Sequence, residues 1–201
     1  MSLVSDQLVL VRHGETVHNV SGITQGWSDS ALSDRGNAQV HALAARVVRL
    51  KPDALFCSPL ERAMSTARPI AEATGLEIVA LDDLREMNYG RWEGQSFRDI
   101  RANDADAARR WMEDPDCPCP GGESHNDVRE RLVRAFAAAA GSARPVIVTH
   151  GTAIRIGATI LLDAPMVLSR HLAQDNASIN LFVRRGERMV LKLWNDTSHY
   201  Q

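Results

Sequence analysis

The sequence predicts an α/β protein of three layers, α/β/α, whose central sheet is mostly parallel with at least one antiparallel strand. Short apolar runs alternate with stretches of helical periodicity, which indicates a parallel sheet with helices on both faces. The runs 8–11 and 145–148 are apolar throughout, as expected of strands buried on both faces. Near the end of the chain, 178–184 and 188–194 flank Gly186 and predict a hairpin, which supplies the antiparallel strand.

Each further element has a local signal. Ser33 is a typical helix-start residue, and the apolar residues that follow it up to Leu50 have the spacing of an amphipathic helix. Ser58 and Glu61 have capping-box spacing, and Pro59 suits the first helical position, so a helix should begin there. The other predicted elements are strands at 54–57 and 76–81 and helices at 96–113, 124–140 and 151–162.

The composition is that of one ordinary globular domain. The chain has 201 residues, of which 44% are hydrophobic and 24% charged, enough for one substantial core. We therefore expect residues 1–201 to form one domain, with 84–125 as a small helical cap. The net charge of −2 gives no reason to expect nucleic acid or an anionic membrane as a partner, and no apolar run approaches the ~20 residues of a membrane span.

Two weaker patterns bear on the location of the protein in the cell, and none bears on its assembly. Residues 1–7 lack the charged and apolar regions of a signal peptide, and three cysteines are too few for a disulfide framework. We therefore expect a cytoplasmic location with reduced thiols. No pattern encodes the oligomeric state, and a homodimer is the general expectation for an assembly.

Arg12 and His13 stand at the carboxyl end of the first predicted strand. In open α/β sheets, ligands bind at this end of the strands. A guanidinium beside an imidazole suits a phosphate, because arginine can hold it with two hydrogen bonds while histidine attacks or protonates it. Two polar surface residues are the alternative interpretation, and this segment alone does not separate the two.

Two further segments favour the phosphate interpretation. His150 and Gly151 follow the strand that begins at Pro145, so two strands would deliver a histidine to the same edge of the sheet. Arg62 lies in the first turn of the helix predicted after Ser58, where free backbone N–H groups and the helix dipole favour an anion. If this segment stood alone, an exposed helical arginine would be the simpler interpretation.

Four motifs in order resemble those of the histidine phosphatase superfamily, in its phosphoglycerate-mutase-like branch. They are Arg12-His13-Gly14-Glu15-Thr16, Ser58-Pro59-Leu60-Glu61-Arg62-Ala63, Leu84-Arg85-Glu86 and Thr149-His150-Gly151, and the resemblance extends from Leu8 to about Trp194. It implies a metal-independent phosphomonoesterase that needs no cofactor. In this family pattern His13 is the nucleophile that forms a phosphohistidine, while Arg12, Arg62 and His150 stabilise charge on the transferring phosphoryl group.

The reaction also needs a general acid that protonates the leaving oxygen and then takes a proton from water. By chemistry alone the candidates are Asp82, Asp83, Glu86, Glu93 and Glu15. The resemblance points to Glu86. The place of Glu15 inside the first motif suits a supporting hydrogen bond better.

Substrate contacts are expected from the loop 19–32 and from Gly151. Asn19 resembles the family residue that donates to the phosphate, and Gln25 and Gly26 belong to the segment that covers it. Gly151, at a helix start, could offer its backbone N–H to the phosphate. A polar loop rich in Ser, Gly and Asn could equally be an inert connection.

The resemblance leaves three functions open. A mutase must shield its phosphohistidine from water, and the mutases that resemble this chain carry a long insertion with an Arg pair after the general acid. Here the insertion is short and leads into Pro120-Gly121-Gly122-Glu123-Ser124, which resembles the phosphatase branch, while Arg109-Arg110 resembles the mutase pair only superficially. These features favour a phosphatase that acts on a small phosphorylated metabolite.

The end of the chain, 193–200, resembles that of bacterial phosphatases, including ones that act on sugar or glycerate phosphates. A cofactor-dependent phosphoglycerate mutase is the alternative function. An inactive phosphate-binding module is a weaker alternative, because all five core residues are present.

Overall fold

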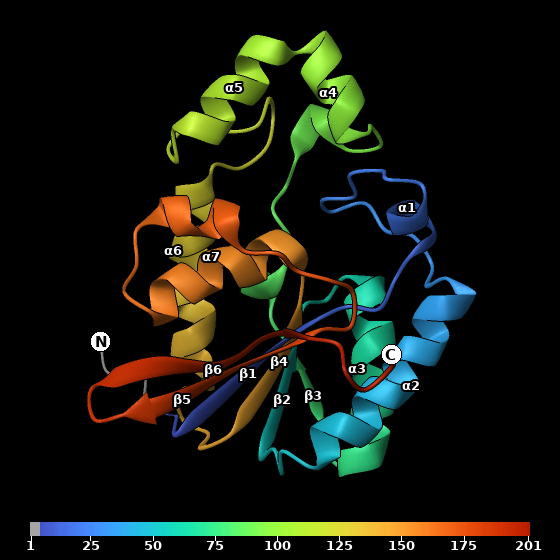
Figure 1. The fold of residues 1–201 in the computed structure, drawn as a ribbon, viewed down its shortest axis with the longest axis vertical. Helices are drawn as coiled ribbons and strands as arrows, with labels where there is room; N and C mark the ends of the chain where they lie inside the picture. The colour runs from blue at the N-terminus through green and yellow to red at the C-terminus, as the bar shows by residue number, and fades with distance from the viewer. Residues whose placement is uncertain (1–4) are drawn as a thin grey trace.

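The computed structural model describes residues 5–201, so residues 1–4 of the predicted domain lie outside the described range. Its centre is a six-stranded sheet with the strand order β3-β2-β4-β1-β5-β6 (Figure 1). The strands are β1 Gln7–Arg12, β2 Ala54–Cys57, β3 Ile78–Ala80, β4 Pro145–Thr149, β5 Ile179–Arg185 and β6 Arg188–Asp196.

The sheet is mostly parallel. β1 pairs with β4, β4 with β2, and β2 with β3 in parallel, whereas β5 runs antiparallel to both β1 and β6. The β5–β6 hairpin turns at Gly186, whose φ of 62° lies in the left-handed region that glycine adopts without strain. The predicted fold class, including its antiparallel strand, is confirmed.

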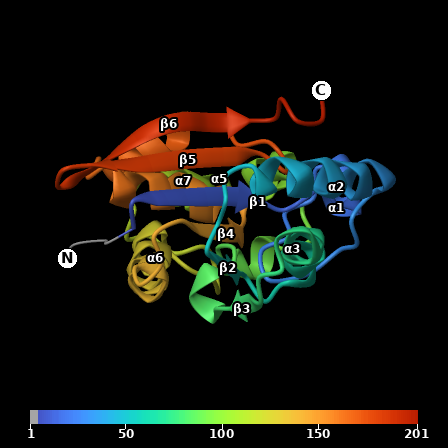
Figure 2. The ribbon, with the colours of Figure 1, turned by 90° about the horizontal axis from the view of Figure 1, so that it is seen from below.

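Helices cover both faces of the sheet (Figure 2). The pair α6 and α7 packs on one face and the pair α2 and α3 on the other. In β1, Leu8 and Leu10 join the core of the first face, while Val9 and Val11 join that of the second. The helix bounds are α1 Val17–Val20, α2 Asp34–Val48, α3 Glu61–Thr74, α6 His125–Ala139 and α7 Gly151–Leu161. Within residues 5–201, no helix has the length and apolarity that crossing a bilayer requires.

Helix α3 begins later than the capping-box spacing predicts. Leu60 is its N-cap residue, and the carboxylate of Asp29 accepts the backbone N–H of Glu61 at 2.7 Å. Ser58 and Pro59 therefore precede the helix, and the Ser58 hydroxyl contacts His150 instead. The predicted start was wrong because a loop carboxylate, distant in sequence, satisfies the first N–H groups of α3. The anion that binds the start of α3 is thus the carboxylate of Asp29.

The cap contains two helices where the periodicity predicts one at 96–113. They are α4 Phe97–Asn103 and α5 Ala105–Glu113, and the 3₁₀ helices around them are η1 Asp82–Leu84, η2 Gly90–Trp92 and, later, η3 Met166–His171. Asp104 separates α4 from α5 with a non-helical φ of −140°, and its carboxylate accepts the indole N–H of Trp92 at 3.0 Å. This anchor fixes the break between the helices. Figure 1 places α4 and α5 together at one end of the molecule, away from the hairpin β5–β6.

Candidate active site

β1 and β4 end side by side at one edge of the sheet. Arg12 pairs with Thr149 in the parallel register, so His13 and His150 follow at matching positions. The centroids of the two imidazole rings are 5.2 Å apart. The structure thus brings together the two histidines that the sequence assigns to the same sheet edge.

His13 is buried, with 3% of its surface exposed, and its ring orientation is fixed. Its Nδ1 lies 2.8 Å from the carbonyl oxygen of Gly14, which can only accept, so Nδ1 carries the proton. Burial, followed by the charges of Arg62 and Arg12, lowers the pKa of His13 well below its ordinary value. Nε2 therefore keeps a free lone pair at neutral pH, which an attack on phosphorus requires.

Arg12 and Arg62 supply positive charge around His13. Arg62 is 1% exposed and donates from Nη1 to the backbone oxygen of Ser28 at 2.8 Å. Arg12 donates from Nη1 to the backbone oxygen of Gln174. The Nε atoms of both arginines are buried and have no hydrogen-bond partner among the described residues. Each Nε–H can therefore be satisfied by an acceptor such as a phosphate oxygen.

His150 lies beside His13 but is not among the residues that line the cavity. It is fully buried as the N-cap residue of α7, and its Nε2 is 2.8 Å from the hydroxyl oxygen of Ser58. Burial and then the charge of Arg62 lower the pKa of His150 well below its ordinary value, so the ring is neutral. Its Nδ1 is buried and has no hydrogen-bond partner among the described residues, so the direct place around the phosphoryl group that the sequence predicts for His150 stays a prediction.

Glu86 lies between η1 and η2, and its carboxylate meets the start of α7. Oε1 accepts the backbone N–H groups of Met87 at 2.8 Å and Ala153 at 3.1 Å. Oε2 accepts the single N–H of Thr152 at 3.0 Å. The helix terminus thus fixes the carboxylate through backbone donors. Because Oε2 has one such bond and Oε1 has two, Oε2 has room for a transferred proton.

Of the five candidate carboxylates, only Glu86 lines the cavity. Asp82, Asp83 and Glu15 form ion pairs outside it. Glu15 also accepts a hydrogen bond from the Ser33 hydroxyl at 2.7 Å, consistent with the predicted supporting role. The remaining candidate, Glu93, accepts the backbone N–H groups of Trp27 and Ser28 in a neighbouring loop. The geometry therefore favours Glu86 where the chemistry of the sequence left the choice open.

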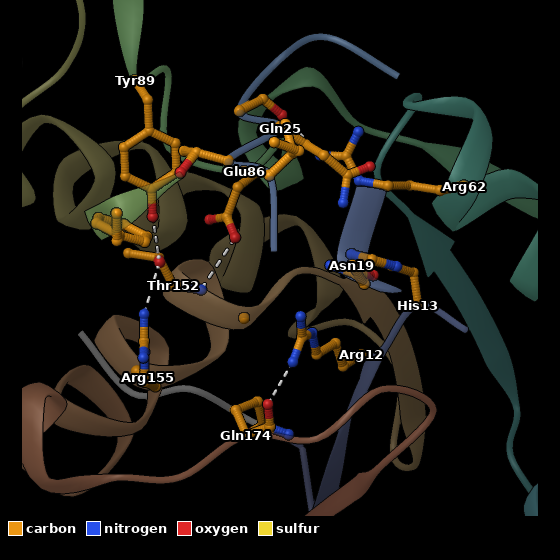
Figure 3. Close-up of a pocket in the computed structure, with 15 residues that line it drawn as sticks. Arg12, His13, Asn19, Gln25, Arg62, Glu86, Tyr89, Thr152, Arg155 and Gln174 are labelled. Carbon is orange, nitrogen blue, oxygen red and sulfur yellow. Dashed lines mark hydrogen bonds between the residues drawn. The ribbon is translucent and has the colours of Figure 1, made fainter. Parts of the chain in front are cut away.

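The site groups share a cavity of about 230 Å³ (Figure 3). The amide oxygen of Asn19 accepts from the hydroxyl of Thr16 at 3.0 Å and from Nδ2 of Asn176 at 3.0 Å, so its NH₂ group is left as a donor. Gly151 lies against Arg12, since a Cβ added to it would be 3.5 Å from that guanidinium. The predicted residues that line this cavity are Arg12, His13, Asn19, Gln25, Gly26, Arg62, Glu86 and Gly151.

Sequence reasoning missed several lining residues, namely Tyr89, Phe97, Thr152, Arg155 and Gln174. Arg155 donates from Nη2 to the hydroxyl of Thr152 at 2.8 Å, and that hydroxyl lies 2.7 Å from the hydroxyl of Tyr89. A signal for Arg155 was present, because it is the one charged residue of α7 and lies one turn after Gly151 on the same face. Tyr89 and Gln174 lie in irregular segments that carry no such signal.

The loop 24–29 connects the cap to Arg62. Oε2 of Glu93 accepts the backbone N–H of Ser28 at 3.0 Å, and the carbonyl oxygen of Gly26 accepts Nη2 of Arg62 at 2.6 Å. Gly26 has a φ of 56°, and an added Cβ would lie 2.0 Å from Oε1 of Glu93. A side chain here would be strained and would displace the Glu93 carboxylate, so glycine preserves the contacts that link Arg62 to the cap.

A sequence profile of the histidine phosphatase superfamily (branch 1) matches residues 8–197. The chain belongs to the histidine phosphatase superfamily. The family that the four motifs indicate is thereby confirmed, and the profile covers every residue of the cavity described above.

Relatives in this family carry names of two activities. Phosphoserine phosphatase 1 of Hydrogenobacter thermophilus is 33% identical over 96% of this chain and 93% of that protein. A probable phosphoglycerate mutase of Erwinia tasmaniensis is 33% identical over 97% of this chain and 95% of that protein. Sequence similarity at this level therefore identifies the family but does not separate a phosphatase from a mutase.

Structural similarity extends over the whole fold. The mycobacterial glucosyl-3-phosphoglycerate phosphatase in complex with VO3 has a TM-score of 0.84 and 34% identity, covering 95% of this chain and 99% of that chain. The chain also spans about half the length, 54%, of three mycobacterial relatives that it matches, among them a bifunctional protein of Mycobacterium tuberculosis. That protein is 34% identical over 96% of this chain.

Proposed function

We propose that this protein is a metal-independent phosphomonoesterase that uses a phosphohistidine at His13 and acts on a small phosphorylated metabolite. The orientation of one ring carries the proposal. Nδ1 of His13 donates to Gly14 at 2.8 Å, so the unprotonated Nε2 is available beside Arg12 and Arg62, with Glu86 on the same cavity. A buried neutral nucleophile, two cations and one carboxylate are the groups that two-step phosphoryl transfer requires.

The first step would form the phosphoenzyme. The lone pair of Nε2 of His13 attacks phosphorus, the ester P–O bond breaks, and its electron pair stays on the leaving oxygen. A proton from Oε2 of Glu86 completes the alcohol. Arg12 and Arg62 stabilise the charge that gathers on the phosphoryl oxygens, which is the larger part of the catalytic task.

The second step would regenerate the enzyme. Glu86 takes a proton from water, the water oxygen attacks phosphorus, and the N–P bond breaks with its electron pair returning to Nε2. Inorganic phosphate leaves and His13 is again neutral. The N–H groups of α7 that bind the Glu86 carboxylate keep it in place for both proton transfers.

The guanidinium groups supply the positive charge that a metal supplies in other phosphatases. Among residues 5–201, no group of three or more His, Cys, Asp or Glu side chains is arranged to hold a metal ion. We therefore expect full activity in EDTA. Since the related mycobacterial phosphatase binds VO3, we also expect orthovanadate to inhibit, as an analogue of the five-coordinate transition state.

Two observations favour hydrolysis over phosphoryl return to a second substrate. Arg109 and Arg110, which resemble the mutase pair in sequence, are exposed on α5 and line no part of the phosphate cavity. Phe97, on the cavity wall, is 42% exposed, so water has access beside it. We therefore expect water, rather than a second substrate, to accept the phosphoryl group from His13.

One assay tests the proposal against the mutase alternative. The EDTA-treated protein is given 3-phosphoglycerate with catalytic 2,3-bisphosphoglycerate, and both phosphate and 2-phosphoglycerate are measured. Release of phosphate without 2-phosphoglycerate is the expected result. Fast formation of 2-phosphoglycerate without phosphate would identify a mutase. An absence of turnover with a broad panel of sugar and glycerate phosphates would favour the inactive binding module.

The predicted cytoplasmic location and homodimer stay predictions, as do the exclusions of nucleic acid and membrane as partners. The two exclusions rest on the net charge of −2. Fractionation of cells and sedimentation of the purified protein are the measurements that address them.

A further inference from the structure

A second cavity adjoins the phosphate cavity, between the cap and the segment that follows α7. It has a volume of about 260 Å³ and shares three lining residues with the first cavity, Phe97, Thr152 and Arg155. Because Arg155 and Thr152 border both, this space is adjacent to the cavity in which the phosphate would lie near His13. Figure 3 shows Arg155 at the side of the phosphate cavity, joined to Thr152 by a hydrogen bond.

One wall of this second cavity is apolar and aromatic. Phe97 and Trp111 are stacked with ring centroids 6.3 Å apart and planes 25° from parallel. Met112 extends the wall, and both Phe97 and Met112 are about two-fifths exposed, at 42% and 40%. Large apolar side chains left exposed at a cavity are typical of ligand contact rather than of a free surface.

The rest of the lining carries unbalanced positive charge. Arg101, Arg155 and Arg170 line the cavity and no carboxylate does. Within the described part of the chain, none of the three forms an ion pair, and Glu113, in the neighbouring recess beside Arg101 and Arg170, pairs with neither.

Burial and two of these arginines also lower the pKa of His125, another residue that lines the second cavity. Burial, and then the charges of Arg170 and Arg155, lower the pKa of His125 to about 4, so it is neutral at pH 7. Its ring packs on Trp111 with centroids 4.8 Å apart. The second cavity therefore has one aromatic wall and three arginines in the rest of its lining, and no carboxylate lines it.

We propose that this second cavity binds the alcohol part of the substrate, and that it selects phosphomonoesters whose alcohol carries an apolar or planar portion ending in a second anionic group. The planar portion packs against Phe97 and Trp111, and the anion, a carboxylate or a second phosphate, is held by Arg101 and Arg170, whereas Arg155 donates to Thr152 on the border of the two cavities. This inference rests on the proposed phosphatase function and adds the substrate class to it. A guanidinium forms its strongest hydrogen bonds with such oxyanions.

Three synthetic esters separate the contributions. Benzyl phosphate tests turnover alone, 4-carboxybenzyl phosphate adds the anion, and 4-carbamoylbenzyl phosphate replaces it by a neutral group of the same shape. The leaving alcohols are chemically alike, so a difference between the last two reports on charge recognition. We expect kcat/KM for the carboxylate to exceed that for the carboxamide about tenfold, equivalent to about 1.4 kcal/mol, and to do so through KM.

Variants of the arginines show which side chains recognise the carboxylate of the substrate. Arg101→Gln and Arg170→Gln should each reduce the tenfold preference, and the double variant should bring it close to one. Arg98→Gln is the matched control, because Arg98 is an exposed arginine of α4 that lines neither cavity, and it should keep the preference.

Each outcome decides one of the two proposals. Equal kcat/KM for the carboxylate and the carboxamide, with benzyl phosphate hydrolysed, would overturn the subsite and leave the phosphatase standing. A preference that survives in the double variant would also overturn it. No phosphate release from any of the three esters would overturn the phosphatase function itself.

Discussion

The two cavities differ in how their functional groups are held. In the phosphate cavity the groups are fixed mostly by the backbone: His13 by the carbonyl of Gly14, Arg62 by the carbonyls of residues 26 and 28, and Glu86 by three N–H groups. Arg62 also forms an ion pair with Asp29 at 2.8 Å. In the second cavity, Arg101 and Arg170 are exposed surface side chains, and Phe97 is 42% exposed. One region is organised before a ligand arrives, and the other must order around it.

This difference matches two kinds of demand. Phosphoryl transfer depends on placing charges to within fractions of an ångström, which backbone donors and acceptors achieve. Recognition of an anion by exposed arginines costs side-chain entropy, so it contributes less per group. Substitutions in the phosphate cavity should therefore cost orders of magnitude in rate, whereas those in the second cavity should change the choice of substrate by small factors.

The largest effect is expected for His13→Ala. Without the nucleophile, kcat should fall by about 10⁴-fold or more for every ester, because the second step has no intermediate to act on. Steady-state phosphate release, with circular dichroism to verify the fold, measures it. Turnover within tenfold of the wild-type protein would contradict the mechanism.

Arg62→Gln comes next, with a loss in kcat of about 10²- to 10³-fold from the missing charge. Arg68→Gln is the matched control, since Arg68 lies on the same helix but is exposed and pairs with Glu61 at 2.6 Å. Its kcat should be unchanged. Equal losses in the two variants would mean that the Arg62 effect comes from the stability of α3 rather than from charge at the phosphate.

Glu86→Gln should separate esters by leaving group. An alkyl phosphate should lose about 10²- to 10³-fold, because its alkoxide needs a proton, while p-nitrophenyl phosphate should lose far less in the first step. Pre-steady-state release of p-nitrophenol isolates that step. If the two esters lose equally, the proton donor is another group, and the contacts of Glu86 with α7 are structural.

A smaller effect is expected for the pH dependence of stability, which involves the buried histidines in and beside the two cavities. The pKa values of His13, His150 and His125 are lowered in the folded protein, so between those values and about 6.5 the unfolded chain binds more protons. Stability is therefore full above pH 6.5 and falls as the pH decreases below it.

The variant His125→Gln tests how much His125, in the second cavity, contributes to the pH dependence of the free energy of unfolding. Between pH 7.5 and 5, its free energy of unfolding should fall by about 2 kcal/mol less than that of the wild-type protein, because 1.4 kcal/mol accrues per pH unit below 6.5. Urea titrations at both pH values measure this, and His41→Gln, exposed on α2, is the control. Identical losses in the wild-type protein and His125→Gln would show that His125 does not titrate as described.

Most of the fold could be predicted because the strands are short apolar runs with clear boundaries. β1, β4 and the β5–β6 hairpin are found where the patterns place them. The start of α3 could not be predicted, since its N–H groups are satisfied by Asp29, which is near only in the fold. The break at Asp104 likewise depends on a tertiary contact, the hydrogen bond from Trp92.

The site divides in the same way into residues with a local sequence signal and residues that only tertiary packing brings together. His13, Arg62 and Glu86 carry local motifs, so the sequence places them, and the structure then brings them to one cavity. The second cavity is assembled from α4, α5, α6, α7 and η3, and no motif joins Phe97 to Arg170 along the chain. The substrate subsite that we propose is therefore encoded in tertiary packing, beyond the reach of sequence patterns.

The most direct test of the central claim is to trap the phosphoenzyme. Glu86→Gln is mixed with p-nitrophenyl phosphate, which needs little proton donation, and is quenched in alkali, where phosphohistidine is stable. Because the second step lacks its base, the intermediate should accumulate, and tandem mass spectrometry should place one phosphate on His13. The account assigns that phosphate to Nε2, since Nδ1 is held by Gly14. A burst of p-nitrophenol without phosphate on His13, or with phosphate on another residue, would contradict the account.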